Sequence, residues 1–282
     1  MSTEEVDLDE DAKAATKTGT YKHRLDDGTV IQLPTEFMSV TQLLMMLKCP
    51  AQYEKRYVEG IKTPPGIALI EGSSGHDALE FQNAFQILRG RPMPLKKVLD
   101  RYGDVLAMKS KEVPADEWRR NGENKDTVYH RGVPLLTSYM QQIAPKVKPS
   151  SAEQHFKMKV KGVPFQGFID LGEDEALWDY KFCSPTTFTK LKHGIGADLQ
   201  LTAYSMGAKV RRVGLIPLIK GRGEVHMLGS VRTKRDYLGF EDVVVRAAKA
   251  ISAGSFTLCL PDAWYCSPKW CGYWSRCRGR FA

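Results

Sequence analysis

Two short stretches near the middle of the chain have apolar and aromatic residues at strand spacing. Residues 165–171 and 176–182 are rich in aromatic and β-branched side chains, and a polar run at 172–175 separates them. Two such runs joined by a short polar loop predict a β-hairpin. If the turn is centred between Asp174 and Glu175, Asp170 is predicted to lie directly opposite Asp179.

The two predicted carboxylates share one face of the hairpin with a lysine. Directly opposed residues of an antiparallel pair have Cβ atoms about 4.5–5.5 Å apart, which suits two oxygen ligands of one Mg²⁺ or Mn²⁺ ion. Lys181 is two residues past Asp179, so strand alternation returns it to that face. The alternative is a solvent-facing hairpin with scattered charges. The apolar flanks of both strands favour a functional site, because unpaired charge among core residues is costly.

Regular apolar spacing continues on both sides of the hairpin. Residues 153–160 alternate as a strand that ends at a Lys-Gly turn, 161–162, and feeds the hairpin. Helical spacing over 197–210 places Gln200 and Tyr204 on one helix face, because they are four residues apart. Two strands at 213–219 and 224–231 and a helix at 235–251 complete this half of the chain.

The first half of the chain is predicted to be mainly helical. Ser39 with Gln42 three residues later predicts a helix cap, and Pro50 predicts the start of a second helix over 51–58. The Gly- and Ser-rich stretch at 71–75 predicts a loop before a helix over 76–88, which His76 would open. The remaining predictions are a hairpin at 21–33 and a helical insertion over about 90–150, with helices at 95–108 and 127–143.

Composition and charge narrow the class of protein. The chain has 282 residues, of which 42% are hydrophobic, so one domain with a well-buried core is expected over 21–282. Residues 1–20 are expected to form a disordered acidic tail. No apolar run approaches the roughly 18 residues needed to span a bilayer, and the N-terminus is acidic, so a cytoplasmic protein without a membrane partner is expected.

The basic character of the chain is stronger than its net charge indicates. The formal charge is +8, and the first twelve residues hold six acids and no Lys or Arg, so the remainder carries +14. A nucleic-acid partner fits this charge, and a generically basic protein is the alternative.

The C-terminal segment predicts a metal centre. Its three closely spaced cysteines are Cys266, Cys271 and Cys277. In a chain without a secretory signal, such a group favours a metal or cluster over disulfides. A tetrahedral or cubane site needs a fourth ligand, for which Cys49 is the candidate and Cys259 the substitute. Cys183 and Cys259 are otherwise expected to be buried thiols.

The motifs G-x-I-D, W-D-Y-K and Q-x-x-x-Y, in this order and spacing, resemble the RecB-like branch of the PD-(D/E)XK nuclease superfamily. The resemblance implies that Asp170 and Asp179 bind a catalytic metal and that Lys181 assists the attacking water. It also implies that a His opening the helix before the hairpin completes the metal site. The metal ligands are then His76, Asp170, Asp179 and the backbone carbonyl of Tyr180, and the DNA-holding residues are Gln200 and Tyr204.

The cysteines resemble those of RecB-like nucleases with an iron-sulfur cluster, such as the bacterial AddAB helicase-nuclease and the CRISPR adaptation-associated exonucleases. These have one Cys before the nuclease core and three after it. The resemblance implies a 4Fe-4S cluster on Cys49, Cys266, Cys271 and Cys277. The gap of four residues after Cys266 is longer than usual in that group, which leaves zinc open.

The expected fold is therefore α/β, a restriction-endonuclease-like PD-(D/E)XK core with a mixed central sheet flanked by helices and a cluster joining its N- and C-terminal parts. The expected activity is that of a Mg²⁺- or Mn²⁺-dependent deoxyribonuclease, an exonuclease on DNA that is single-stranded or has free ends. A helicase, recombinase or CRISPR-type partner is consistent with the resemblance, and a phage or mobile-element origin is left open. The alternatives are a non-catalytic DNA-binding or recruitment module and a zinc-stabilised RNA-binding protein. Glu80 and Glu153 receive no role.

Overall fold

The computed structural model describes residues 20–281, so the predicted acidic tail at 1–20 lies, except for its last residue, outside the described residues. The described chain divides into two compact units, each built from segments that are far apart in sequence. The first unit contains residues 20–63, 157–166 and 239–281, and the second contains 64–156 and 167–238. The assignment of 21–282 to a single domain stays a prediction.

The predicted hairpin is present, with the predicted register. It consists of β5 (Val163–Gly172) and β6 (Ala176–Cys183). Leu171 lies opposite Trp178 in the antiparallel pair. The same register, continued by one residue, sets Asp170 opposite Asp179. The pairing therefore places the two acids on neighbouring strands, as the loop length predicted.

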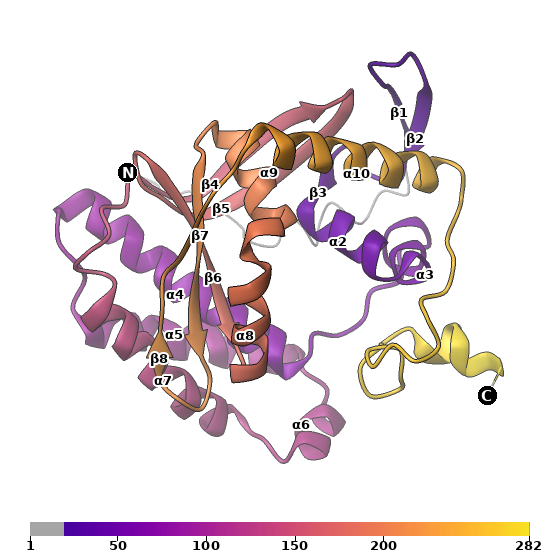
Figure 1. The fold of residues 1–282 in the computed structure, drawn as a ribbon. Helices are drawn as coiled ribbons and strands as arrows, with labels where there is room; N and C mark the ends of the chain where they lie inside the picture. The colour runs from indigo at the N-terminus through magenta and orange to yellow at the C-terminus, as the bar shows by residue number, and fades with distance from the viewer. Residues whose placement is uncertain (1–19, 282) are drawn as a thin grey trace, which may run out of the picture. The chain divides into compact units, whose positions relative to one another are not determined.

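The second unit builds a mixed sheet on this hairpin (Figure 1). Strand β6 pairs in parallel with β7 (Arg212–Ile219), which confirms the predicted strand at 213–219. The predicted strand at 224–231 is divided into β8 (Glu224–Val225) and β9 (Leu228–Val231), and both pair antiparallel with β7. The predicted mixed central sheet is confirmed.

Helices cover both faces of this sheet within the second unit. The helices on one side are α4 (Ile67–Arg89), α5 (Leu95–Lys109) and α7 (Lys125–Gln142), and α6 (Ala115–Asn121) connects the last two. Those on the other side are α8 (Pro185–Gly194) and α9 (Leu199–Ala208) (Figure 1). Because side chains alternate along β6, Tyr180 points to α4 and hydrogen-bonds Asn83, whereas Asp179 points to α9 and hydrogen-bonds Tyr204. The side chain of Asp179 therefore lies towards α9, and that of Tyr180 lies towards α4 in the main apolar core.

Helix α4 differs from the prediction at its start. The predicted loop at 71–75 is wrong, because the helix already begins at Ile67 and includes these residues. Gly75 lies against the ring of Phe182, and a Cβ at this position would overlap that ring. The small residues therefore permit close packing of α4 on β6 instead of forming a turn. His76 consequently lies in the middle of a long helix.

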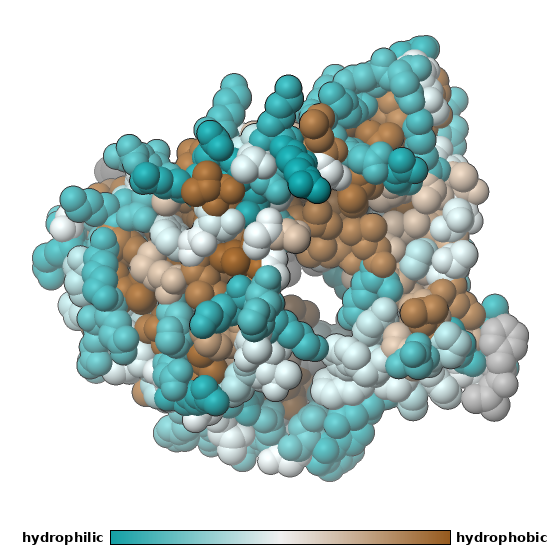
Figure 2. Space-filling model, viewed as in Figure 1, coloured by the Kyte–Doolittle hydropathy of each residue, from teal (hydrophilic) through white to brown (hydrophobic). Residues whose placement is uncertain are grey.

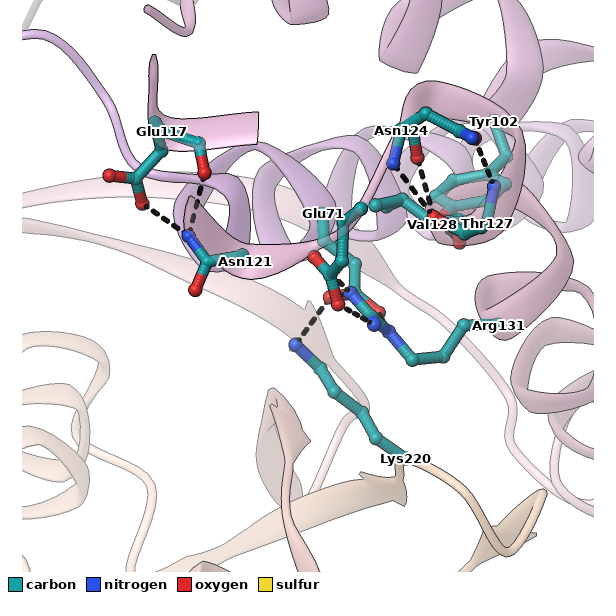
Figure 3. A network of polar contacts seen from close by, with 10 residues as sticks. Glu71, Tyr102, Glu117, Asn121, Asn124, Thr127, Val128, Arg131 and Lys220 are labelled. Carbon is teal, nitrogen blue, oxygen red and sulfur yellow. Dashed lines mark hydrogen bonds and ion pairs between the residues drawn. The ribbon is translucent and has the colours of Figure 1, made fainter. Parts of the chain in front are cut away.

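A buried ion-pair network holds α4 in place (Figure 3). The carboxylate of Glu71, which is 1% exposed, accepts hydrogen bonds from Nε and Nη2 of Arg131, both at 2.9 Å. Its Oε2 also accepts a bond from Nζ of Lys220 at 2.7 Å. One acid thereby joins α4 to α7 and to the end of β7, and it stabilises the helix that carries His76.

The first unit contains the N-terminal and C-terminal segments. The predicted hairpin at 21–33 is confirmed as β1 (Tyr21–Arg24) and β2 (Val30–Leu33). The Ser39 side chain caps the next helix by accepting a bond from the Gln42 amide at 3.2 Å, as predicted. Strand β3 (Met38–Ser39) pairs in parallel with β5 at residues 165–166. Two helices follow it, α2 (Val40–Lys48) and α3 (Pro50–Tyr53), and α3 continues into a π-helical turn (Glu54–Val58). Strand β4 (Ser151–Val160), which pairs with β5, and helix α10 (Lys234–Ser252) each contribute to both units.

The visible surface is mostly polar. Figure 2 shows hydrophilic side chains over much of the viewed face, interrupted by smaller apolar patches. None of the helices in the described part of the chain is long and apolar enough to cross a membrane.

Candidate active site

The hairpin carries the first carboxylate of the site in a fixed orientation. Asp170 is buried, and its Oδ2 accepts a hydrogen bond of 2.7 Å from the backbone amide of Tyr180 on the opposite strand. The same oxygen lies 3.2 Å from Nδ1 of His76 on α4. The long helix and the hairpin therefore bring together two residues that are 94 positions apart in the chain.

The second carboxylate belongs to a closed ring of four side chains. Nζ of Lys181 lies 2.6 Å from Oδ2 of Asp179 and donates a hydrogen bond of 2.8 Å to Gln200. Gln200 in turn donates to the hydroxyl of Tyr204 at 2.8 Å, and this hydroxyl donates to Oδ1 of Asp179 at 3.2 Å. The ring thus unites residues of two separate motifs, W-D-Y-K and Q-x-x-x-Y.

Helix α9 is held at its start by a buried arginine. Asp198 caps the helix by accepting a bond from the Leu201 amide at 2.9 Å. Arg232, which is fully buried, donates from Nε to the Thr202 hydroxyl at 2.9 Å and from Nη2 to the Asp198 carbonyl at 3.1 Å. These contacts position the first turn of α9 and so position Gln200.

The ring of Tyr204 is inside the protein. It is 3% exposed and packs edge-on against Phe156, with ring centroids 6.1 Å apart. The ring offers no free face for a DNA base to stack on. Its hydroxyl fixes the carboxylate of Asp179, and a role of Tyr204 in holding DNA stays a prediction.

Glu153 joins the site, although the sequence analysis assigned it no role. A ring nitrogen of His76 and one carboxylate oxygen each of Glu153 and Asp170 all lie within 4.8 Å of one another. Glu153 has a backbone φ of 45°, a left-handed conformation that non-glycine residues rarely adopt. The sequence places Glu153 at the start of a strand that leads into the hairpin, and this position could have indicated a site residue. The left-handed backbone conformation of Glu153 could not be predicted from the sequence.

The electrostatics of the site show an excess of buried negative charge. Burial raises the pKa of Glu153 to about 8, and the nearby charges of Asp170 and Glu80 add to the effect. Burial also raises the pKa of Asp179 to about 6, with Asp170 raising it further and Lys181 opposing the shift. A positive charge placed among these carboxylates would relieve both effects.

The two basic groups of the site favour their charged forms. Burial alone would lower the pKa of Lys181, but the Asp179 carboxylate outweighs burial and raises it. In the same way, Asp170 raises the pKa of His76 against the effect of burial. His76 and the Tyr180 amide lower the pKa of Asp170 although burial opposes them. Lys181 is therefore an ammonium group at neutral pH and can donate hydrogen bonds but not accept a proton.

The donor atoms fit a divalent cation. Oδ2 of Asp179 is a buried oxygen that lies 2.6 Å from Nζ of Lys181. The converging atoms of His76, Glu153 and Asp170 are two carboxylate oxygens and one imidazole nitrogen, a donor set that suits a divalent cation. The backbone carbonyl of Tyr180 stays a predicted ligand.

The sequence model of the PD-(D/E)XK nuclease superfamily matches residues 38–278. The chain therefore belongs to this superfamily, whose members are nucleases that use divalent metal ions such as Mg²⁺. Among solved structures, it is similar to a candidate exonuclease from Eubacterium rectale, with 12% identity, a TM-score of 0.47 and coverage of 82% of this chain and 86% of that one. None of the curated proteins matches the chain.

A second candidate site lies in the first unit, where five cysteines line one pocket. These are Cys49, Cys259, Cys266, Cys271 and Cys277. All are free thiols. The Ala51 amide donates to the Thr257 carbonyl at 3.1 Å and the Tyr265 hydroxyl to the Lys48 carbonyl at 3.0 Å, so the segment of Cys49 lies beside the C-terminal segment. Cys183 is a buried thiol at the end of β6, as expected.

The thiols of this pocket fit a metal centre. Tetrahedral zinc takes four ligands, and four thiolates are one of its usual sets. Four thiolates are also the usual ligand set of an iron-sulfur cluster, and a cluster spreads its ligands over more than one metal ion. The thiols present therefore fit such a group.

Proposed function

We propose that this protein is a deoxyribonuclease that uses Mn²⁺ or Mg²⁺ to hydrolyse DNA phosphodiester bonds, as an exonuclease on single strands or free ends. The observation that supports this most directly is the convergence of His76, Glu153 and Asp170 beside the ion pair of Asp179 and Lys181. The imidazole ligand favours Mn²⁺ over Mg²⁺, because Mg²⁺ prefers oxygen ligands throughout. Action on DNA ends follows the resemblance to RecB-like exonucleases.

The residues of the site have separate tasks in this reaction. A bound divalent cation would supply charge stabilisation at the scissile phosphate and lower the pKa of the attacking water. Lys181, held as an ammonium group by Asp179, orients that water by donating a hydrogen bond or stabilises the charge that develops on the phosphate oxygens. Gln200 and Tyr204 hold Lys181 and Asp179 in position.

The test is cleavage of labelled DNA in the presence of Mn²⁺, Mg²⁺ or EDTA. A linear single strand and a closed circular single strand of the same sequence are incubated with the protein, and RNA of that sequence is a competitor. Metal-dependent degradation of the linear DNA, with the circle spared, is the expected result. Cleavage of the circle at the same rate would contradict the exonuclease assignment, and the absence of cleavage with either metal would contradict the proposed function itself.

We also infer that the first unit holds a 4Fe-4S cluster through Cys49, Cys266, Cys271 and Cys277. The support is the pocket that these four thiols line, together with the resemblance of the cysteine arrangement to that of RecB-like nucleases with such a cluster. Cys49 and Cys277 are 228 residues apart. A cluster that binds both closes a loop around most of the chain, and closure of a long loop restricts the unfolded state. The cluster is therefore assigned a structural role.

Cys271→Ser tests this assignment, with Cys183→Ser as the matched control because Cys183 lies outside the pocket. Wild type purified without oxygen should be brown and contain iron and sulfide. Cys271→Ser should be colourless and melt at a lower temperature, whereas Cys183→Ser should resemble wild type. One equivalent of zinc without iron in the wild-type protein would overturn the cluster assignment and leave the nuclease assignment unaffected.

A further inference from the structure

The thiol pocket contains one cysteine more than a metal centre of this kind needs. Tetrahedral zinc and a 4Fe-4S cluster each take four cysteine ligands. Five cysteines line the pocket, and the additional one is Cys259. The spacing of the C-terminal cysteines alone does not distinguish which four bind, because Cys259 precedes Cys266 by only seven residues.

Contacts of neighbouring residues place the segments of Cys259 and Cys266 beside the segment of Cys49. The Ala51 amide donates to the Thr257 carbonyl at 3.1 Å, and the Tyr265 hydroxyl donates to the Lys48 carbonyl at 3.0 Å. Burial raises the pKa of the Cys259 thiol, and the neighbouring thiols of Cys266 and Cys49 raise it further. Cys259 is thus a neighbour of two of the predicted ligands.

The backbone holds Cys259 at this position. Nη2 of Arg278 donates a hydrogen bond of 2.7 Å to the carbonyl oxygen of Cys259. The same guanidinium lies near the Cys266 thiol, and Arg278 directly follows Cys277 in the chain. One arginine therefore ties the segment of Cys259 to two of the predicted ligands, so this fifth thiol is held at the pocket by contacts of its own.

We propose that Cys259 is a reserve ligand of this metal centre, which replaces Cys49 or Cys266 when either is lost but does not replace Cys271 or Cys277. The proposal rests on the metal centre inferred above. In the replacement, the Cys259 thiol loses its proton to solvent, and its sulfur forms the metal bond that the missing sulfur would have formed. No electron is transferred.

The experiment compares the metal content of single and double variants purified without oxygen. Iron, zinc and acid-labile sulfide per chain and the visible spectrum are measured for the wild type, for Cys183→Ser as the outside control, and for each pocket cysteine replaced by Ser. Cys259→Ser should keep the full metal content. Cys49→Ser and Cys266→Ser should keep about half or more of it, because metal binding and folding are coupled and a fourth thiolate is still available. Cys271→Ser and Cys277→Ser should lose nearly all of it.

The double variants decide whether Cys259 is the replacement. Cys49→Ser combined with Cys259→Ser, and Cys266→Ser combined with Cys259→Ser, should lose the metal that the single variants keep. The proposal is overturned if Cys49→Ser and Cys266→Ser lose metal as completely as Cys271→Ser, and an insoluble single variant counts as such a loss. Loss of metal from Cys259→Ser alone would make Cys259 an ordinary ligand and also overturn it.

The same measurements separate this proposal from the cluster assignment. If the wild type carries zinc without iron, the cluster assignment fails, and the pattern of zinc loss then decides the role of Cys259. A wild-type protein without bound metal overturns both. DNA cleavage with Mn²⁺, measured in parallel, reports on the separate acidic site.

Discussion

Glu71→Gln tests how strongly one buried carboxylate holds the helix that carries His76. The substitution keeps the shape of the side chain but removes its negative charge from between Arg131 and Lys220 (Figure 3). Three hydrogen bonds from cationic donors reach the Glu71 carboxylate. The amide oxygen of glutamine, placed where Oε2 lies, can keep two of them, whereas its NH₂ group then faces Nε of Arg131 and cannot accept the third.

The expected loss of stability is about 3 kcal/mol, because one hydrogen bond to a charged group, worth about 1.5–3 kcal/mol, is lost and the two that remain are weakened by the loss of the negative charge on their acceptor. Breaking a buried ion pair costs about 3–5 kcal/mol. The lower end applies here, since Arg131 also pairs with Glu123 and is partly exposed. For a unit of this size, 1 kcal/mol corresponds to roughly 2–4 °C, so the melting temperature should fall by roughly 6–12 °C.

The assay is urea unfolding followed by far-UV circular dichroism, combined with a thermal melt. The matched control is Glu175→Gln, because Glu175 pairs with Arg212 on the surface, where such pairs contribute about 0–1 kcal/mol. An unfolding free energy for Glu71→Gln within 1 kcal/mol of wild type would refute the assignment of Glu71 as the anchor of α4.

Three further results are expected. Raising the pH from about 6 to 9 should strengthen Mn²⁺ binding, measured by titration calorimetry. Asp179 and Glu153 have pKa values of about 6 and 8, so over this range they lose the protons that compete with the metal. An Mn²⁺ affinity independent of pH would contradict these values. Tyr204→Phe should weaken Mn²⁺ binding by about 10–100-fold through loss of its bond to Asp179, whereas Tyr237→Phe, which removes a hydroxyl bonded to Ser205, should not. The affinity for single-stranded DNA should fall with salt at a logarithmic slope of about −0.7 for each phosphate contacted, and a flat dependence would exclude a basic binding groove.

The features that could be predicted from the sequence are those set by local spacing. The loop length and the alternation of the strands determine the hairpin register, so the placement of Asp170 beside Asp179 followed directly. The four-residue spacing on one helix likewise placed Gln200 next to Tyr204. Helix α8 was equally accessible, since Ser184 caps it and Pro185 occupies its first turn, although no helix was predicted there.

The features that could not be predicted depend on tertiary packing. Glycine and serine at 71–75 are ordinary loop signals, and only the close contact of Gly75 with Phe182 makes them helical. Glu153 reaches the site through a left-handed backbone conformation that its sequence does not encode locally. The inward orientation of Tyr204 likewise depends on Phe156, a residue of a different strand.

The central claim is that Asp179 and its neighbours form a metal-dependent nuclease site, and Asp179→Asn tests it most directly. The measurement is the rate at which this variant degrades end-labelled single-stranded DNA with Mn²⁺, beside Asp174→Asn, which changes an exposed aspartate in the turn of the same hairpin. DNA binding is measured for both variants in EDTA. The expected result is that Asp179→Asn lowers cleavage by at least about 100-fold while its DNA affinity stays within a few-fold of wild type, and that Asp174→Asn changes neither quantity. Cleavage by Asp179→Asn at the wild-type rate would contradict the assigned site.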